Sequence, residues 1–454
     1  MNATIAAVRT ALESGATTSR ALVQTCIDHA EAASGEGART FVRVFAESAI
    51  ADAEAIDRRR QAGIWTGPLG GIPISIKDLF DIRGIPTTAG SVVLAEAAPA
   101  SADAVVVSRL RAAGAVIVGR TNMTEFAFSG LGLNPHFGTP ANPYDRSTRR
   151  IPGGSSSGAA ISVCDGMAMA AIGTDTGGSV RIPAALCGLV GFKPTAARIP
   201  LAGTLPLSIS LDSIGPLTRS VKCCRILDAV LSDQPCEAAH SVSLQDLRIA
   251  VPTTRVFDDI DAHVSRTFES ALAVLVDAGA KVSQIHVSEF ADVGQTAEVA
   301  TFPAVEGYSW HRDLLGRARD RYDPRVAVRI ERGRSVSAAD YLWLLRRRSE
   351  LMRAVKSRVG GFDVLAMPTV PIIAPPIGGL DRDDDLYHRV NLLVLRNPTL
   401  INFLDGCALS LPCHGNGEAP VGLMLARFDG ADHDLLAIGE AAERALASKR
   451  ASNR

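Results

Sequence analysis

The sequence between Ile151 and Thr195 is IPGGSSSGAAISVCDGMAMAAIGTDTGGSVRIPAALCGLVGFKPT, and it contains two glycine-flanked serine loops separated by an apolar segment. Paired glycines let a ligand approach backbone N–H groups, and each pair leads into a serine and then a segment suited to a helix. Ser155 and Ser179 are 24 positions apart. That interval predicts a helix from about Ser156 to Cys164 and a strand from about Met167 to Ile172, so the two loops can meet. We therefore expect an active site here.

Lys77 is the candidate for the base that activates these serines. No histidine lies between His136 and His240, and only six of the 47 basic residues are lysines. Lys77 ends the run GGIPISIK, whose alternation predicts a strand with Ser75 and Lys77 on the face opposite the isoleucines. If that face points into a desolvated pocket, the pKa of the lysine falls. Neutral lysine can then accept a proton, which arginine cannot do.

The two serine loops and the upstream lysine resemble the amidase signature family, serine hydrolases that cleave carbon–nitrogen bonds with a Ser-cisSer-Lys triad. The motifs that carry the resemblance are GIPISIKDLFD, GGSSSG and GTDTGGSVRIPA. Five further stretches have the family's character: Gly114–Phe128, Asn142–Asp145, Gly191–Thr195, Ser210–Ser220 and Ile401–Cys413. Together these motifs cover most of the chain, whereas Val221–Arg353 matches only in general character.

The resemblance implies a role for each member of the triad. Ser179 is the nucleophile, Ser155 is the bridging serine and Lys77 is the ultimate base. Lys77 takes a proton from Ser155, Ser155 takes one from Ser179, and Ser179 attacks the amide carbonyl to form an acyl-enzyme, which water hydrolyses. Asp175 and Arg181 flank the nucleophile, and we expect this charged pair to brace the loop rather than to take part in the chemistry.

The same resemblance implies an oxyanion hole and an acyl pocket. The hole is expected from the backbone N–H groups of Thr176, Gly177, Gly178 and Ser179. The loop FAFSGLGL at Phe126–Leu133 borders the acyl pocket in the family, and it suggests an apolar or aryl acyl group. The predicted pocket residues are Phe128, Ser129 and Leu131, although apolar side chains of this loop can equally belong to the core.

A competing interpretation comes from Gly154–Gly158, which satisfies the G-x-S-x-G pattern of the α/β-hydrolase nucleophile elbow with Ser156 at its tip. Asp363 and His414 are available downstream as partners. However, that elbow should follow a strand, and the preceding Asp145–Gly154 is polar and broken by proline. The triad interpretation is therefore favoured.

A second alternative is that the chain belongs to an assembly of several subunits. The family includes the amidase subunit of the tRNA-dependent amidotransferase, which releases ammonia from glutamine for a partner. That subunit typically has glutamine where this chain has Ile182, and Ala197–Ser208 resembles free-standing amidases. The favoured interpretation is a stand-alone hydrolase of a small-molecule amide, or of a related carbamate or ester.

Helix and strand signals alternate along the chain, which predicts an α/β fold with a mixed β-sheet core flanked by α-helices, as in the amidase signature fold. A βαβ-like unit is expected from the strands Leu247–Val251 and Ala280–Val287 around a helix at Ala262–Ala278. A capping box at Ser337–Asp340 predicts a helix that runs to about Val359. Its expected core stripe is Tyr341, Leu345, Met352 and Val355.

One domain of residues 1–454 is expected, with a helical N-terminal segment at about 1–65, the signature core at about 66–220 and a more variable region at about 221–454. The chain is 47% hydrophobic and has a formal net charge of −1, which gives no electrostatic footprint for nucleic acid or an anionic membrane. No apolar run approaches 18 residues.

Cofactors and metals are not expected, because phosphate-binding glycine motifs, H-E-x-x-H and C-x-x-C are all missing from the sequence. Eight cysteines without a regular framework indicate a reducing compartment, and the N-terminus lacks a signal peptide's charged start and apolar region. The predicted location is the cytoplasm. A homodimer is one possible assembly.

Overall fold

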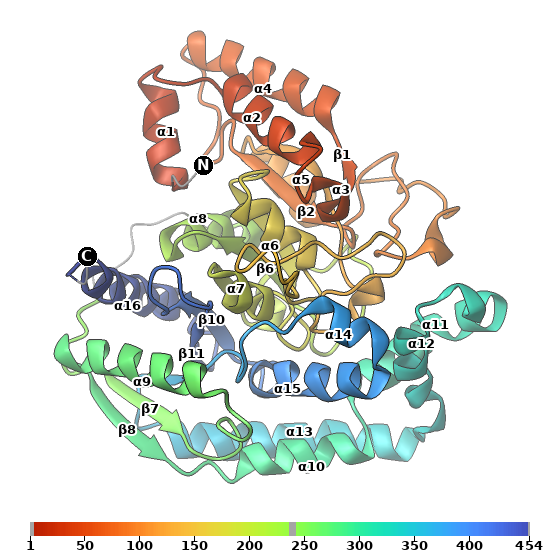
Figure 1. Ribbon diagram of the computed structural model, residues 1–454, viewed down its shortest axis with the longest axis vertical. Helices are drawn as coiled ribbons and strands as arrows, with labels where there is room; N and C mark the ends of the chain where they lie inside the picture. Colours follow the sequence, from red (N-terminus) through yellow and green to blue (C-terminus); the bar gives the residue numbers. More distant parts are fainter. Residues whose placement is uncertain (1–3, 236–241, 453–454) are drawn as a thin grey trace.

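A computed structural model describes residues 4–235 and 242–452, and Figure 1 shows the arrangement of its helices and strands. The strands are β1 (Phe41–Val44), β2 (Pro73–Lys77), β3 (Val116–Thr121), β4 (Ala170–Thr174), β5 (Val190–Lys193), β6 (Ile214–Thr218), β7 (Arg248–Pro252), β8 (Lys281–Ile285), β9 (Val364–Pro368), β10 (Cys407–Pro412) and β11 (Gly422–Arg427). Within the described ranges they form an 11-stranded mixed sheet in the order β1-β3-β2-β4-β6-β5-β10-β11-β9-β7-β8.

The α-helices lie on both faces of this sheet. They are α1 (Ile5–Glu13), α2 (Ser19–Glu31), α3 (Gly37–Thr40), α4 (Ala46–Gln61), α5 (Val105–Ala112), α6 (Ser157–Cys164), α7 (Arg181–Cys187), α8 (Val221–Ser232), α9 (Ala262–Asp277), α10 (Glu289–Val299), α11 (Phe302–Ala318), α12 (Pro324–Glu331), α13 (Ala338–Val359), α14 (Ile377–Arg382), α15 (Asp384–Phe403) and α16 (Asp432–Ser452). The predicted α/β fold with a mixed sheet between helices is confirmed.

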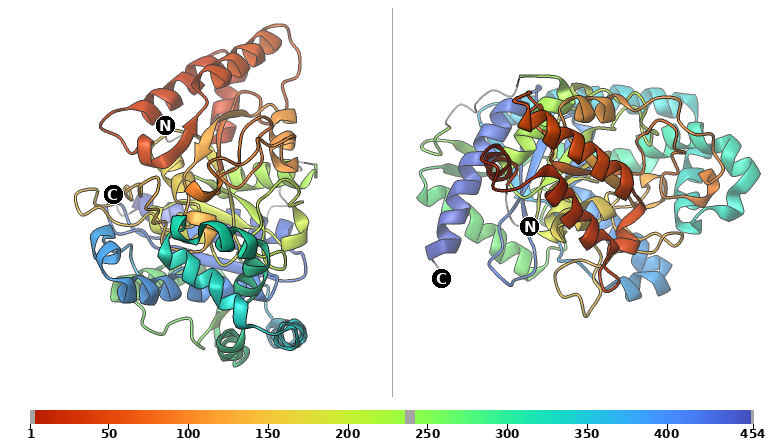
Figure 2. Two further views of the ribbon diagram at one scale, coloured as in Figure 1. Left: turned by 90° about the vertical axis from the view of Figure 1, so that its right-hand side faces the viewer. Right: turned by 90° about the horizontal axis from the view of Figure 1, so that it is seen from above.

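The apolar clusters that a helix shares with the strands show which face of the sheet it covers. Helices α1, α5, α8, α9 and α16 share apolar clusters with one face. Helices α2, α4, α6, α7, α10, α13 and α15 share clusters with the other. Helices α11 and α12 lie toward the viewer in the left view of Figure 2.

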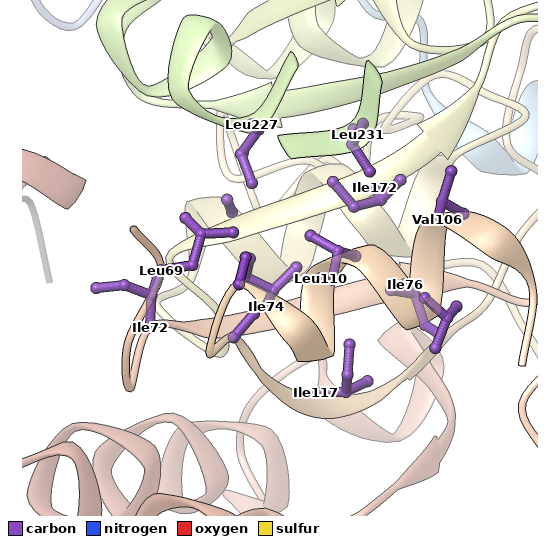
Figure 3. Packing of buried hydrophobic residues seen from close by; sticks show 14 of the residues in the cluster. Leu69, Ile72, Ile74, Ile76, Val106, Leu110, Ile117, Ile172, Leu227 and Leu231 are labelled. Atoms are coloured by element: carbon purple, nitrogen blue, oxygen red, sulfur yellow. The ribbon is translucent and has the colours of Figure 1, made fainter. Parts of the chain in front are cut away.

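The alternation of β2 decides which of its side chains enter the core and which face the site. Ile74 and Ile76 pack with Leu110 and Leu227 in the apolar cluster of Figure 3. Ser75, on the opposite face, lies 2.8 Å from the hydroxyl of Ser162 in α6. The predicted strand, with Lys77 on the face away from the isoleucines, is thereby confirmed.

Two local predictions hold with shifted bounds. Strands β7 and β8 pair in parallel around α9, which confirms the βαβ unit. Helix α13 begins with the predicted capping box at Ser337 and Asp340, but the expected core stripe is wrong at Leu345, which is 37% exposed. Leu344 and Leu351 are buried instead. Neighbouring helix positions are about 100° apart, so an error of one residue turns a side chain from the core to the surface.

The N-terminal segment differs from the prediction by one strand. β1 lies among the N-terminal helices and pairs antiparallel with β3 at the sheet edge. Its short FVRV sequence is rich in residues that favour strands. Of the helices in residues 4–235 and 242–452, none combines the length and the hydrophobicity that crossing a bilayer requires. The division of the chain into one domain with three regions stays a prediction.

Candidate active site

Parallel strand pairing brings Lys77 and Thr174 together. Lys77 is the last residue of β2 and Thr174 the last residue of β4, and these strands are hydrogen-bonded neighbours in parallel register. The carboxyl ends of parallel strands meet at one edge of a sheet, where open α/β proteins build their sites. The strand predicted at Met167–Ile172 actually runs from Ala170 to Thr174, and this shift is what carries Thr174 to the site.

Lys77 is completely buried and lies within hydrogen-bond distance of two hydroxyls. Its Nζ is 2.8 Å from Ser155 Oγ and 2.8 Å from Thr174 Oγ1. Burial lowers the pKa of Lys77 to about 7, against the opposing attraction of the Asp175 and Asp212 carboxylates. A substantial fraction of Lys77 is therefore neutral near pH 7, in the form that can accept a proton.

Ser155 occupies the turn that precedes α6. The Gly154–Ser155 peptide bond is cis, at the position that the family resemblance marks. The carbonyl of Ser155 accepts a hydrogen bond from the Thr124 N–H at 3.0 Å. The N–H of the next residue, Ser156, donates to the Ser179 carbonyl at 3.3 Å. The two serine loops of the sequence therefore meet directly.

Ser179 lies on the wall of a cavity of about 240 Å³. The residue is only 3% exposed, and its hydroxyl has no hydrogen-bond partner among the residues that the structure describes. Gly178, just before it, has a φ of 121°, and a Cβ there would lie 2.5 Å from the Cβ of Pro398. Only glycine fits this turn, which presents the Ser179 hydroxyl to the cavity.

A buried ion pair braces the loop that carries Ser179. Asp175 and Arg181 are both fully buried, and two hydrogen bonds of 2.9 and 3.0 Å join the guanidinium to the carboxylate. Asn402 of α15 donates to Asp175 Oδ1 at 2.9 Å and accepts from Arg181 at 2.5 Å. Burial alone would raise the pKa of Asp175, but Arg181, Lys193 and Asn402 hold it well below its usual range. The sequence prediction that this pair braces the loop agrees with this geometry.

The brace also changes the expected oxyanion hole. The N–H of Gly178 donates to Asp175 Oδ1 at 2.8 Å, so it is not available to a reaction intermediate. Inclusion of Gly178 among the donors was therefore wrong, because a carboxylate folded under the loop accepts its hydrogen bond. The N–H groups of Thr176, Gly177 and Ser179 have no acceptor within the described part of the chain.

Comparison with known proteins identifies the family of the chain. A sequence model named Amidase matches residues 21–436. The chain belongs to the amidase signature family. It is thus an enzyme that hydrolyses carbon–nitrogen bonds of amides, as the sequence predicted.

Individual relatives cover nearly the whole amidase. It is 37% identical over 421 residues to the 2-amino-5-chloromuconic acid deaminase of Comamonas testosteroni, and the match covers 90% of this chain and 88% of that protein. It is 36% identical over 440 residues to a glutamyl-tRNA(Gln) amidotransferase subunit of Roseiflexus sp. strain RS-1, with 89% of each chain covered. A crystal structure of an amidase has a TM-score of 0.87 and 31% identity, covering 97% of this chain and 99% of that one.

The cavity of this amidase includes two of the three predicted pocket residues. Phe128 and Ser129 line it, but Leu131 does not. Leu131 is fully buried and packs with Ile182 and Val394 in an apolar cluster beneath the loop. The prediction for Leu131 was wrong because only the first part of this loop, Ala127 to Ser129, lines the cavity, whereas Leu131 faces the core. Nearly half of the lining residues come from α10, α15 and the start of α11, which the sequence did not indicate.

Sequence reasoning also missed a carboxylate that supports the nucleophile loop. Asp212 is buried, accepts from the Thr176 hydroxyl at 2.5 Å and accepts from the N–H groups of Leu207 and Ser208. Burial and the charge of Glu306 raise its pKa to about 6. Asp212 lies inside the motif at Ser210–Ser220, and Asn402 lies inside the motif at Ile401–Cys413. These motifs were the available signal for both residues.

Ser156 does not have the surroundings of a nucleophile elbow. It is fully buried, and its hydroxyl donates to the Thr174 carbonyl at 3.4 Å. Among the described residues no histidine is hydrogen-bonded to it. Asp363 forms an ion pair with Arg248, and His414 accepts a hydrogen bond from the Val421 N–H. Residues 4–235 and 242–452 contain no group of three His, Cys, Asp or Glu side chains placed to hold a metal ion.

Breaking the brace should destabilise this amidase far more than breaking an exposed pair of the same geometry. Arg181→Met leaves the Asp175 carboxylate buried and unpaired, so the free energy of unfolding should fall by about 3–5 kcal/mol. Arg248→Met removes a bidentate arginine whose side chain is 54% exposed, and unfolding should hardly change. Urea unfolding followed by circular dichroism measures both. Equal losses in the two variants would show that the brace is not special.

Proposed function

We propose that this amidase hydrolyses its substrate through Ser179 as nucleophile, Ser155 as bridging serine and Lys77 as base. The observation that carries the proposal is the fully buried Lys77, whose Nζ lies 2.8 Å from Ser155 Oγ while burial lowers its pKa to about 7. A lysine in this state is a base at neutral pH. The free Ser179 hydroxyl at the cavity wall supplies the nucleophile.

The proposed reaction starts with the attack of Ser179 Oγ on the amide carbonyl carbon. Its proton passes to Ser155 Oγ while the proton of Ser155 passes to Lys77 Nζ. The relay requires the Ser179 hydroxyl to turn toward Ser155, and the hydroxyl's lack of a hydrogen-bond partner among the described residues leaves it free to do so. The relay then runs backwards and protonates the leaving nitrogen, so the carbon–nitrogen bond breaks and an acyl-enzyme remains. Water, deprotonated through the same relay, hydrolyses that ester and releases the carboxylic acid.

The negative charge that develops on the carbonyl oxygen needs donors that are already in place. We assign this role to the N–H groups of Thr176, Gly177 and Ser179. The Asp175–Arg181 brace and the Asp212–Thr176 hydrogen bond fix the loop, so little reorganisation is needed during the reaction. The apolar wall near Phe128 supports the proposal of an acyl group bound in the cavity, from an amide or a related carbamate or ester.

A role within an amidotransferase is the second candidate, and the likeness to the Roseiflexus protein favours it. The cavity offers an argument against glutamine as substrate. Its lining, in the part of the chain that the structure describes, includes no aspartate or glutamate that could pair with the ammonium group of glutamine. Ile182, at the position where the amidotransferase relatives typically have glutamine, packs in an apolar cluster.

The purified chain should release ammonia from small-molecule amides without any partner. Glutamine should be a poor substrate, because its ammonium group would be desolvated without a counter-charge. Steady-state assays of ammonia release on a panel of aryl amides, aliphatic amides and glutamine measure this. Turnover confined to glutamine, or turnover that appears only after partner subunits are added, would favour the amidotransferase interpretation.

We also propose a cytoplasmic enzyme that acts on small molecules, without nucleic acid or membrane as partner, and with a homodimer as one possible assembly. No disulfide joins the cysteines of the described residues, which supports a reducing compartment. The near-zero net charge supports the lack of a polyanionic partner.

Removal of the nucleophile should abolish turnover. Ser179→Ala should lower kcat by a factor on the order of 10⁶, because the acyl-enzyme forms on that oxygen. The variant should also resist labelling by a fluorophosphonate, whereas Ser156→Ala should still be labelled. Intact-mass spectrometry after labelling measures this outcome. A labelled peptide carrying the probe on Ser155 or Ser156 would contradict the assignment.

The rate should follow the ionisation of Lys77. Protonated lysine cannot act as a base, so kcat/KM should rise with pH up to about 7 and then level off. Lys77→Arg and Lys77→Met should both lose most activity, because a guanidinium keeps its charge and cannot accept a proton. His414→Gln should keep the wild-type profile. If Lys77→Arg kept near-normal turnover and His414→Gln lost its activity, the result would instead support the α/β-hydrolase elbow with Ser156 as nucleophile.

A further inference from the structure

The cavity beside Ser179 has an unusual charge distribution. Most of its wall is apolar, with side chains such as Leu207, Phe302 and Phe403. Three arginines also line it, Arg255, Arg329 and Arg396, and none of its described lining residues is an aspartate or glutamate. A pocket with several cations and no anion in an apolar wall is suited to a negatively charged ligand.

The guanidinium of Arg396 already donates hydrogen bonds to other groups of the protein. Its Nη2 donates to the Val256 carbonyl at 2.8 Å, its Nε donates to Asn397 at 3.0 Å, and its Nη1 donates to the Asp258 carbonyl. These bonds tie α15 to the loop after β7. Arg396 therefore contributes charge to the cavity, but it has a structural role.

Arg329 of α12, by contrast, has no partner. Its Nη1 is buried without a hydrogen bond, and no ion pair of Arg329 occurs within residues 4–235 and 242–452. The neighbouring acids serve other arginines. Asp323 pairs with Arg325 at 3.1 Å, and Glu331 pairs with Arg319 at 2.8 Å. Arg329 is half-buried as a residue, and a buried guanidinium nitrogen without a partner costs free energy, which is expected where a ligand supplies the anion.

Arg255 reinforces this positive region. Its side chain makes no hydrogen bond or ion pair in the described ranges, and its guanidinium lies directly over Gly294 of α10, where any Cβ would overlap with it. The glycine thus leaves space for this guanidinium at the cavity wall. The carboxylates of Asp258 and Asp259 partly offset the charge of Arg396, but neither lines the cavity, whereas Arg255 adds a second cation at its wall. At the cavity wall itself, cations therefore stand without a lining carboxylate.

We propose that the substrate of this amidase carries a carboxylate on its acyl part, and that Arg329 pairs with that carboxylate. The inference rests on the proposed function, since Ser179 and Arg329 line the same cavity. The planar fork of a guanidinium matches a carboxylate with two parallel hydrogen bonds, which fixes the direction of the acyl chain. The simplest such substrate is the monoamide of a dicarboxylic acid. The apolar wall then contacts its carbon chain.

The test compares monoamides of four- to six-carbon dicarboxylic acids with the neutral diamides of the same acids. Wild-type kcat/KM should be about 10- to 100-fold higher for the best monoamide than for its diamide. Arg329→Gln should remove this preference by lowering the monoamide value, and should change diamide turnover less than about threefold. The matched control is Arg334→Gln, which removes the same charge from an exposed position five residues further on, outside the cavity wall, and should alter neither.

A second readout does not depend on finding the best substrate. Free dicarboxylates should protect Ser179 of the wild type from a neutral fluorophosphonate, and Arg329→Gln should be labelled at the same rate with or without them. Labelling of Arg329→Gln also shows that its site is folded. If the wild type shows neither monoamide preference nor protection, or prefers a carboxylate on the leaving amine, the inference is wrong. The triad proposal would survive that result, whereas it would fail if Ser179 of the wild type resisted labelling.

Discussion

The buried pair of Asp175 and Arg181 is the interaction on which the site depends. It lies beneath the turn that presents Ser179, and it joins that turn to α7 and, through Asn402, to α15. One carboxylate thereby accepts hydrogen bonds from the N–H groups of Gly178, Val180 and Arg181. A charged pair costs free energy to bury, so it stabilises this arrangement only because nearly every lone pair and N–H is used. The geometry of the nucleophile is consequently held by groups that do not react.

Two buried lysines of this amidase, Lys193 and Lys77, differ in their hydrogen-bond partners and in how far the pKa falls. Lys193 is as buried as Lys77, but its Nζ donates to the carbonyls of Pro194 and Gly406 at 2.8 Å each, and its pKa falls only to about 8. Lys77 faces two hydroxyls, and its pKa falls to about 7. A hydroxyl can give up its proton to a neutral amine, whereas a carbonyl has no proton to give and can only accept a hydrogen bond. The same burial therefore produces a structural lysine at one position and a candidate base at the other.

Sequence reasoning succeeded where the pattern was local and failed where the outcome depended on packing from a distance. The alternation of GGIPISIK was enough to place Lys77 opposite the isoleucines, and the capping box was enough to start α13 at Ala338. Leu131 and Leu345 were misplaced because an apolar side chain near a site can face either the core or the cavity. Only the elements packed against it settle which. Gly178 was misassigned as an oxyanion donor because nothing local shows that the carboxylate of Asp175 folds back beneath it.

The sequence by itself determined the family, the mixed α/β fold and the identity of the candidate triad. Short-range patterns suffice for these, because glycine turns, strand alternation and signature motifs act over a few neighbouring residues. Tertiary structure alone decided which N–H groups stay free, how far the pKa of Lys77 falls and which arginines enter the cavity unpaired. These properties arise from desolvation and charge between residues distant in sequence. Arg255, Arg329 and Ser179 meet at one cavity only because the sheet and its helices fold them there.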